Sequence, residues 1–155
     1  MRKNKIIIVT GSNRGNGLAI SEGLKHANAR VIGLDIKFDA KDEHSYELDL
    51  TNTALLRDLI DEVYNKYGSI DGLVNNAGIT RDNILVRMKE EEWDEIIDTN
   101  LSSVYKMSKA VLRGMIKKRS GRIISITSVV GATGNAGQSN YAASKAGIIG
   151  FSKSV

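Results

Sequence analysis

Hydrophobic residues recur along this chain in short continuous runs. The runs are rich in Ile, Val and Leu and lie at residues 6–10, 30–36, 46–50, 71–76 and 121–128. They do not alternate with polar residues, which is the pattern of strands buried on both faces of a parallel sheet. We therefore expect five parallel strands at these positions.

Between the runs, hydrophobic residues recur every three or four positions, as on one face of a helix. This spacing predicts helices over residues 17–27, 53–68 and 89–118, and a further helix that begins near Tyr141. We expect strands and helices to alternate, with one helix after each strand. That order predicts an α/β fold with a doubly wound, Rossmann-like parallel sheet and right-handed crossovers.

The last residues modify this expectation. The helix near Tyr141 runs into GIIGFSKSV at residues 147–155, with no helix-stop signal and no following strand. We therefore expect residues 1–155 to form a single α/β domain that is truncated before the last two strands of its fold.

Composition excludes several kinds of site. The 155 residues include no cysteine and only two histidines, His26 and His44, which lie far apart, so we expect no disulfide and no metal site. The net charge is only +4 and aromatic residues make up 5% of the chain, so we expect no nucleic-acid partner. The first hydrophobic run is too short for a signal peptide or a membrane span, so we expect a cytoplasmic protein without a membrane partner.

A glycine-rich segment, TGSNRGNG at residues 10–17, lies between the first strand and the first helix. Its spacing differs from the common G-x-G-x-x-G fingerprint. Even so, glycines permit a tight turn and a close approach of a pyrophosphate, and the helix N-terminus offers unpaired N–H groups to that anion. The segment predicts a dinucleotide site made of Gly11, Ser12, Asn13, Arg14, Gly15, Asn16 and Gly17.

Two charged residues point to different dinucleotides. Asp35 ends the second strand, eighteen residues after Gly17, where a carboxylate can accept hydrogen bonds from the adenosine ribose hydroxyls. Arg14 can instead pair with a 2′-phosphate. Because Asp35 would repel that phosphate, we expect NAD(H) to be favoured, with NADP(H) as the alternative.

The segment SNYAASKAG at residues 139–147 places Tyr141 and Lys145 four residues apart, on one face of a helix. A lysine ammonium there favours the phenolate form of its neighbour. The same spacing is also found where a surface tyrosine lies beside a solvated lysine. Ser128 precedes Tyr141 by thirteen residues at the C-terminal end of a strand, which faces the ligand crevice in such sheets, so the two side chains can converge there.

Taken in order, T-G-x-x-x-G-x-G, the N-N-A-G of residues 75–78, Asn100, Ser128 and Y-x-x-x-K resemble the short-chain dehydrogenase/reductase family. Within that family, NNAGITRDN, MKEEEWDEIIDTNLSSV and GNAGQSNYAASKAGIIGFSKS are similar to the bacterial 3-oxoacyl-(acyl-carrier-protein) reductases. Two residues depart from the pattern: Asn16 stands where the family usually has Ile or Leu, and Asp35 is at odds with the NADPH preference of those reductases.

The resemblance implies a role for each matching residue. Tyr141 is implied as the general acid, Lys145 as the cation that assists it and binds the nicotinamide ribose, Ser128 as a hydrogen-bond donor to the substrate oxygen, and Asn100 as the holder of a water molecule. Gln138 is a candidate for the substrate pocket, and Arg119 for the surface that meets the acidic carrier protein. The further implied cofactor contacts are Asp49, Leu50, Asn76, Ala77 and Gly78.

Three functions remain open at this point. The first is reduction of the 3-oxo group of an acyl thioester on acyl carrier protein, in fatty acid synthesis. The second is NAD-dependent dehydrogenation of a sugar acid, a steroid or another small secondary alcohol, which Asp35 favours. The third is a dinucleotide-binding fragment without turnover. We expect the 155 residues alone to be nearly inactive, and the full-length protein to be a homo-oligomer, a dimer or tetramer, through the helix from residue 89 and the Tyr141 helix.

Overall fold

The computed structural model describes residues 4–155. They form a five-stranded parallel sheet in the order β3-β2-β1-β4-β5. The strands are β1 (Ile6–Thr10), β2 (Arg30–Asp35), β3 (Ser45–Glu47), β4 (Gly72–Asn75) and β5 (Arg122–Ser125). The order reverses between β1 and β4, as in a doubly wound fold, so the C-terminal ends of these two strands flank the crevice in which such sheets bind ligands.

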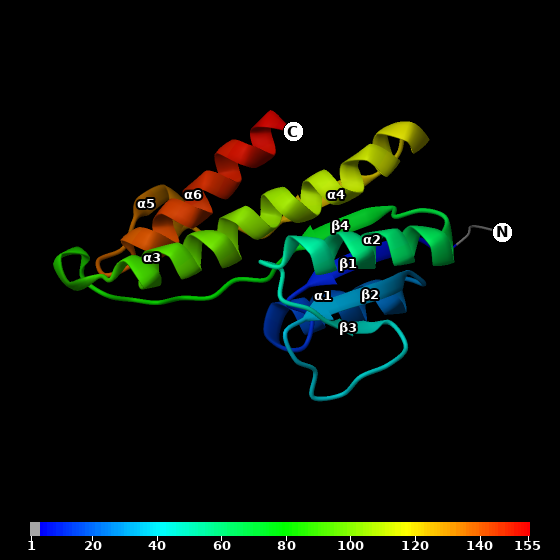
Figure 1. Ribbon diagram of the computed structural model, residues 1–155, viewed down its shortest axis with the longest axis horizontal. Coiled ribbons are helices and arrows are strands. Elements are labelled where there is room, and N and C mark those ends of the chain that lie inside the picture. The colour runs from blue at the N-terminus through cyan, green and yellow to red at the C-terminus, as the bar shows by residue number, and fades with distance from the viewer. Residues whose placement is uncertain (1–3) are drawn as a thin grey trace.

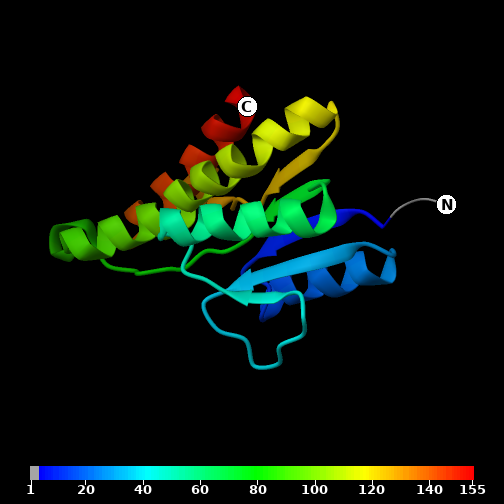
Figure 2. The same cartoon turned by 45° about the vertical axis from the view of Figure 1, so that its right-hand side comes forward.

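Helices cover both faces of the sheet (Figures 1 and 2). The long ones are α1 (Gly15–His26), α2 (Thr53–Tyr67), α4 (Ser103–Lys118) and α6 (Ser139–Ser154). Shorter segments are the 3₁₀ turn η1 (Leu85–Arg87), α3 (Glu90–Ile96), the π-helical turn η2 (Ile97–Ser102) and α5 (Val130–Thr133). The expected fold class is confirmed.

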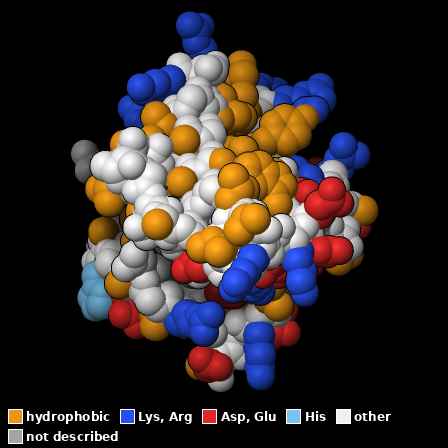
Figure 3. Space-filling model, turned by 90° about the vertical axis from the view of Figure 1, so that its left-hand side faces the viewer, with side chains coloured by type: hydrophobic (Ala, Val, Ile, Leu, Met, Phe, Trp, Pro, Cys, Tyr) orange, Lys and Arg blue, Asp and Glu red, His pale blue; other side chains and the backbone are white. Residues whose placement is uncertain are grey.

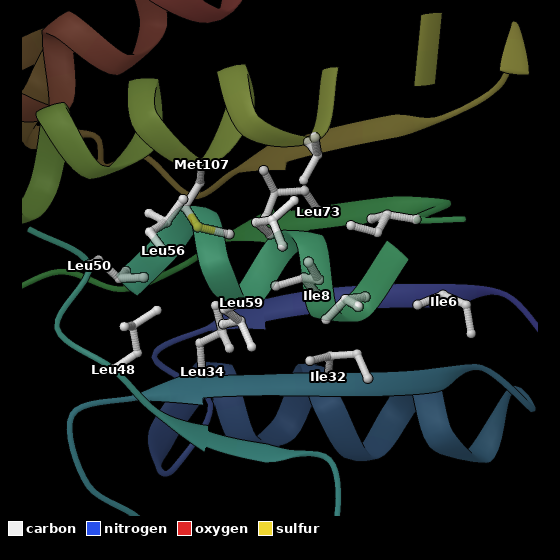
Figure 4. Packing of buried hydrophobic residues seen from close by; sticks show 14 of the residues in the cluster. Ile6, Ile8, Ile32, Leu34, Leu48, Leu50, Leu56, Leu59, Leu73 and Met107 are labelled. Carbon is white, nitrogen blue, oxygen red and sulfur yellow. The ribbon is translucent and has the colours of Figure 1, made fainter. Parts of the chain in front are cut away.

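Alternate residues of the central strands point to opposite faces and build two separate cores. Ile8, Ile32 and Leu73 pack beneath α2 and α4, and Figure 4 shows Leu56, Leu59 and Met107 of those helices above them. On the other face, Val9, Val31 and Val74 pack with Ile20 and Leu24 of α1. The central strands are therefore buried on both faces, as their unbroken hydrophobic sequence predicts.

The outer strands differ from that expectation. β3 is only half-buried, and Ile124 is 55% exposed in β5, which is paired only with β4 among the described residues. A hydrophobic run marks a strand but does not say whether it lies inside the sheet or at its edge. The strands predicted at 46–50 and 121–128 also end earlier, at Glu47 and Ser125.

Two predictions about helices are wrong. No helix separates β2 from β3, because residues 36–44 form a loop. The single helix predicted over 89–118 is three segments, since the backbone widens into the π-helical turn η2 between α3 and α4. Hydrophobic spacing continues through that turn, so the pattern could not reveal it.

Candidate active site

The glycine-rich loop is folded as a cradle at the C-terminal end of β1. Gly11 and Gly15 have the left-handed φ values +65° and +55°, which glycine adopts at little cost. A Cβ on Gly17 would overlap the Gly11 carbonyl oxygen, and one on Gly11 would lie 2.9 Å from Ala77 Cα. Glycine is therefore required where α1 approaches the loop, and the first turn of α1 is left open to an anion.

Asp35 and Asn13 fasten this loop to the end of β2. The Asn13 N–H donates to Asp35 Oδ2 at 3.0 Å, and the Ile36 N–H donates to Asp35 Oδ1 at 2.8 Å. The Asn13 side chain exchanges hydrogen bonds with the backbone and carboxylate of Asp39. Two carboxylates thus lie beside the loop, where a dinucleotide bound in this fold has its ribose.

The segment after β4 is held to the glycine loop by one threonine and one asparagine. Thr10 Oγ1 accepts from the N–H groups of Asn76 and Ala77, each at 3.0 Å. The Asn76 side chain donates to the carbonyl oxygens of Thr10 and Gly11 at 3.1 Å. Asn76 therefore shapes the cradle, while Ala77 and Gly78 offer the bare backbone that a flat ligand can approach. The residues present fit a dinucleotide.

Asn100 lies in the π-helical turn and is fully buried. Its side chain accepts from the Ile79 N–H and donates to the Ile79 carbonyl, both at 2.9 Å, and donates to Ser144 Oγ at 3.4 Å. A π-helical turn inside an α-helix often marks a functional site. Here the turn places the hydrogen-bonded side-chain amide of Asn100 against Ile79, in the segment that follows Gly78.

Tyr141 and Lys145 lie one turn apart on α6, with the lysine Nζ 5.6 Å from the tyrosine ring centroid. Lys145 is only 4% exposed and its Nζ donates to the Ile126 carbonyl at 3.0 Å. Burial lowers the pKa of this lysine. A Cβ on Gly78 would lie 3.5 Å from both Lys145 Nζ and Asn100 Oδ1, so the segment after β4, the lysine and the asparagine meet at one point.

Another pair with the same spacing serves as an internal comparison. Lys109 Nζ donates to Tyr105 Oη at 3.1 Å on the outer face of α4, and both residues are exposed. Spacing alone therefore does not mark a site in this chain. What separates Tyr141 and Lys145 from this surface pair is the burial of the lysine at the end of the sheet.

Ser128 lies in the loop after β5, three residues beyond the last strand residue, Ser125. Its Oγ accepts from the Val130 N–H at 3.2 Å, and its carbonyl accepts from the Gly131 N–H. A Cβ on Gly131 would lie 2.9 Å from backbone atoms of α6, so α5 packs closely on the helix that carries Tyr141 and Lys145. Ser128 is thereby brought to the same side of the molecule.

Other predicted site residues are less direct. The Gln138 side chain is engaged by Asp82 and Asn135, at the entrance to α6. Asp49 caps its own turn through Thr51, and the Leu50 side chain is buried in the core beneath α2, so only the backbone of Leu50 can meet a cofactor. Arg119 is the exposed C-cap of α4 and precedes β5, so it lies at the opposite end of that strand from Ser128.

Sequence analysis missed the residues that hold the site together. Thr10, Asn140 and Ser144 are buried polar residues whose side chains are hydrogen-bonded. Thr10 joins β1 to the segment after β4, whereas Asn140 and Ser144 join α6 to the loop after Gly78 and to Asn100. Their position inside motifs already assigned to the cofactor or to Tyr141 was the signal available.

In the part of the chain that the structure describes, no group of acidic residues and histidines could hold a metal ion. Within residues 4–155, no helix is both long and apolar enough to cross a membrane.

Comparisons with known proteins agree with this geometry. The sequence profile of the short chain dehydrogenase family matches residues 5–155. The chain therefore belongs to the short chain dehydrogenase family.

Among curated proteins, the 3-oxoacyl-[acyl-carrier-protein] reductases FabG of Salmonella typhimurium and Escherichia coli are 52% and 51% identical to it, over 99% of this chain and 66% of theirs. Among solved structures, the ligand-free aldohexose dehydrogenase of Thermoplasma acidophilum has a TM-score of 0.93 at 37% identity, over 98% of this chain and 60% of that one. The chain thus spans about two thirds of the length of the curated relatives that it matches.

Proposed function

We propose that the protein to which these residues belong transfers a hydride between a nicotinamide dinucleotide and a ketone or secondary alcohol. The observation that carries this proposal is the meeting of Gly78, Asn100 and the buried Lys145 at the end of the sheet, beside Tyr141. A phenol next to a buried cation is suited to donating a proton, and the glycine-lined cradle leads to the same point.

The bound dinucleotide supplies the hydride, which goes to the carbonyl carbon, and the products are an alcohol and the oxidised dinucleotide. We assign Tyr141 to give its proton to the carbonyl oxygen, and Ser128 to donate a hydrogen bond to that oxygen as negative charge develops. Lys145 stabilises the phenolate that remains and binds the nicotinamide ribose. Asn100 holds a water molecule through which Lys145 exchanges protons with solvent.

For the substrate we propose the 3-oxo group of an acyl thioester on acyl carrier protein. The curated relatives carry that activity in their names, at about half of all positions identical. Figure 3 shows hydrophobic side chains gathered on the end of the molecule where α3, α5 and the start of α6 lie. Leu85 and Val86 of η1 and Val129, the residue before α5, are exposed, and exposed apolar side chains suit contact with an apolar acyl chain. The same proposal includes a cytoplasmic location and an acidic carrier protein that binds at Arg119. It also includes a homo-oligomer that forms through α3, α4 and α6.

For the cofactor we propose a preference for NAD(H). The Asn13 N–H is already paired with Asp35, and Asp39 adds a second carboxylate beside it. A 2′-phosphate placed there would meet two negative charges, and Arg14 would be its one nearby cation in the loop. The negative charges beside the loop therefore favour NAD(H), in contrast to the NADPH preference expected of the reductases.

A second candidate is an NAD-linked dehydrogenase of a small alcohol. The observation that favours it is Asp35, together with the close structural match to an aldohexose dehydrogenase. This candidate uses the same Tyr141, Lys145 and Ser128 and differs in the substrate alone.

One kinetic panel tests these proposals. This chain, and a form extended at Val155 to the length of the reductases, are assayed with NADH and NADPH against acetoacetyl thioester, and with NAD against aldohexoses and other secondary alcohols. Thioester reduction by the extended form supports the reductase, and oxidation of the alcohols alone supports the second candidate. Cofactor binding without turnover on any substrate would contradict both.

A further inference from the structure

Asn140, the residue before Tyr141, is fully buried in the first turn of α6. Its amide nitrogen donates to the Arg81 carbonyl at 2.9 Å and to the Glu92 carbonyl at 3.2 Å. Its amide oxygen accepts from the Tyr141 N–H at 2.8 Å. A single side chain therefore joins three segments: the loop after Gly78, the helix α3 and the backbone of Tyr141.

Other hydrogen bonds run in parallel with those of Asn140. The Asn83 N–H donates to the Gly137 carbonyl at 2.9 Å, and the Gln138 side chain donates to Asp82 at 3.1 Å. Asn100 reaches the same turn of α6 from the other side, through Ser144 Oγ, which donates to the Tyr141 carbonyl at 2.8 Å. The loop of residues 79–83 and the turn of residues 137–141 are thus linked as one hydrogen-bonded unit, although they lie far apart in the sequence.

Asn140 is the most deeply enclosed member of this unit. Asn83 and Gln138 are at least partly accessible to water, which could replace their bonds, whereas Asn140 has no exposed surface. Without its side chain, the carbonyls of Arg81 and Glu92 and the N–H of Tyr141 lose a buried partner. These three bonds are partly buried, so losing the partner is costly, and we expect the backbone to move to replace it.

We propose that Asn140 is a positioning residue, which fixes Tyr141 relative to the loop that follows the dinucleotide segment Asn76–Gly78. It contacts neither substrate nor cofactor. It acts through the N–H of Tyr141 and the carbonyl of Arg81, and so holds the Tyr141 phenol at a fixed distance from the dinucleotide segment. The importance of that separation for catalysis rests on the proposed function, while the link itself does not.

Amide hydrogen exchange on this chain without ligand tests the link. Two variants are compared with wild type. Asn140→Ala removes all three hydrogen bonds. Asn140→Asp keeps an acceptor for the Tyr141 N–H, but at neutral pH it has no donor for the two carbonyls. Asn52→Ala is the matched control, because Asn52 also holds a helix N-terminus, that of α2, by accepting from the Leu55 N–H. Rates are normalised to the amide of Ile8 in β1, which corrects for any loss of overall stability.

In Asn140→Ala we expect the normalised exchange of both the Tyr141 and the Asn83 amides to rise about tenfold or more. In Asn140→Asp the Asn83 amide is expected to accelerate while the Tyr141 amide stays nearly protected. The control should accelerate Leu55 and leave both of these amides unchanged. Unchanged normalised rates in the Asn140 variants would overturn the proposal, and if Asn140→Ala does not fold, the contrast between the two amides in Asn140→Asp decides it.

Kinetics of the extended form separate positioning from simple support of the fold. A misplacement of Tyr141 by about 1 Å can cost on the order of a hundredfold in rate. We expect Asn140→Ala to lower kcat at least about tenfold while the KM for NADH changes less than about twofold. Equal changes in both constants would refute the positioning role. If the extended form shows no turnover with any substrate, the proposed function fails, and the exchange result still decides the link.

Discussion

At the scale of single residues, Tyr141 is the most direct test of the chemistry. Tyr141→Phe removes only the hydroxyl, so we expect the extended form to lose more than about 99% of its carbonyl reduction, since general acid catalysis contributes roughly 10²–10⁴-fold. Binding of NADH, followed by its fluorescence, should stay nearly unchanged.

Tyr105→Phe is the matched control, because Tyr105 also has a lysine four residues later but lies on the surface. It should leave both turnover and NADH binding as in wild type. Retention of more than a tenth of the activity by Tyr141→Phe would remove Tyr141 from its assigned role.

Lys145 is expected to reduce the stability of the folded chain, because its charged side chain is buried in the site. Burial lowers its pKa, so between that lowered value and about 10.4 the unfolded chain binds more protons and stability rises with pH. We expect Lys145→Met to raise the free energy of unfolding at pH 7, because methionine has no charge that burial would penalise. Urea denaturation should show this gain shrinking as the pH approaches 10. A variant less stable than wild type at pH 7 would show that the hydrogen bond to Ile126 outweighs the cost of burial.

Asp35 is expected to determine the choice of cofactor. Asp35→Ala removes the carboxylate that accepts from the Asn13 N–H and leaves Arg14 in the loop. One charge conflict at such a site is worth about 1–3 kcal/mol, so the ratio of NADPH to NADH affinity should rise roughly ten- to a hundredfold. Titrations of this chain with both cofactors measure the ratio. Asp42→Asn removes a charge further away, in the loop of residues 36–44, and should barely alter the ratio. A wild type that already prefers NADPH strongly would refute the argument.

At the scale of elements, the close approach of α1 to the glycine loop is the feature most sensitive to a single methyl group. Gly17→Ala would place its Cβ on the Gly11 carbonyl, so we expect a loss of about 1–3 kcal/mol in stability and a large loss of NADH affinity. Gly23→Ala lies on the same helix, where a Cβ meets no atom within 4 Å, and should instead stabilise the chain by about 0.5–1 kcal/mol. Thermal unfolding and an NADH titration of both variants check this, and equal behaviour of the two would contradict the account of the cradle.

The same scale shows which elements the sequence can predict. Strands β1, β2 and β4 follow from their hydrophobic runs because burial on both faces leaves few polar positions, most of them at the strand ends. The π-helical turn around Asn100 could not be predicted, because it depends on the bonds that Asn100 makes to Ile79, a partner twenty-one residues away. A regular alternation of strands and helices predicts a helix between β2 and β3, but Asp42 and Ser45 pair with each other there and fold the backbone into a turn.

Part of the candidate site could be predicted for a similar reason. Lys145 and Tyr141 share a helix face by spacing, and Gly11 and Gly17 follow from the turn that they must form. Asn140 and Ser144 could not be distinguished from ordinary polar residues, because their role comes from segments that meet only after folding.

At the scale of the whole molecule, the basic end of α4 is expected to attract an acidic partner. Lys118 is bound to Asp71 at 2.6 Å, which leaves Lys117 and Arg119 exposed beside it. We expect Arg119→Glu to weaken reduction of a carrier-protein-bound substrate about tenfold or more in the extended form and to spare a small thioester, with a smaller effect at high salt. Lys117→Glu, two residues earlier, makes the same charge change and should act less. Equal losses on both substrates would argue against a carrier-protein surface at Arg119.

The backbone conformation at Arg119 affects which residues can replace it in the course of evolution. Arg119 has the left-handed φ of +54°, a conformation that glycine adopts freely and that costs other residues about 1 kcal/mol or more. Ordinary drift at this position would therefore move toward glycine or asparagine, and each such replacement would make the chain more stable. We expect an arginine to persist there where selection for its charge, as at the proposed carrier-protein surface, offsets this cost. A lineage that had exchanged its carrier-bound substrate for a free small molecule would be expected to lose this arginine early, and without any loss of fold.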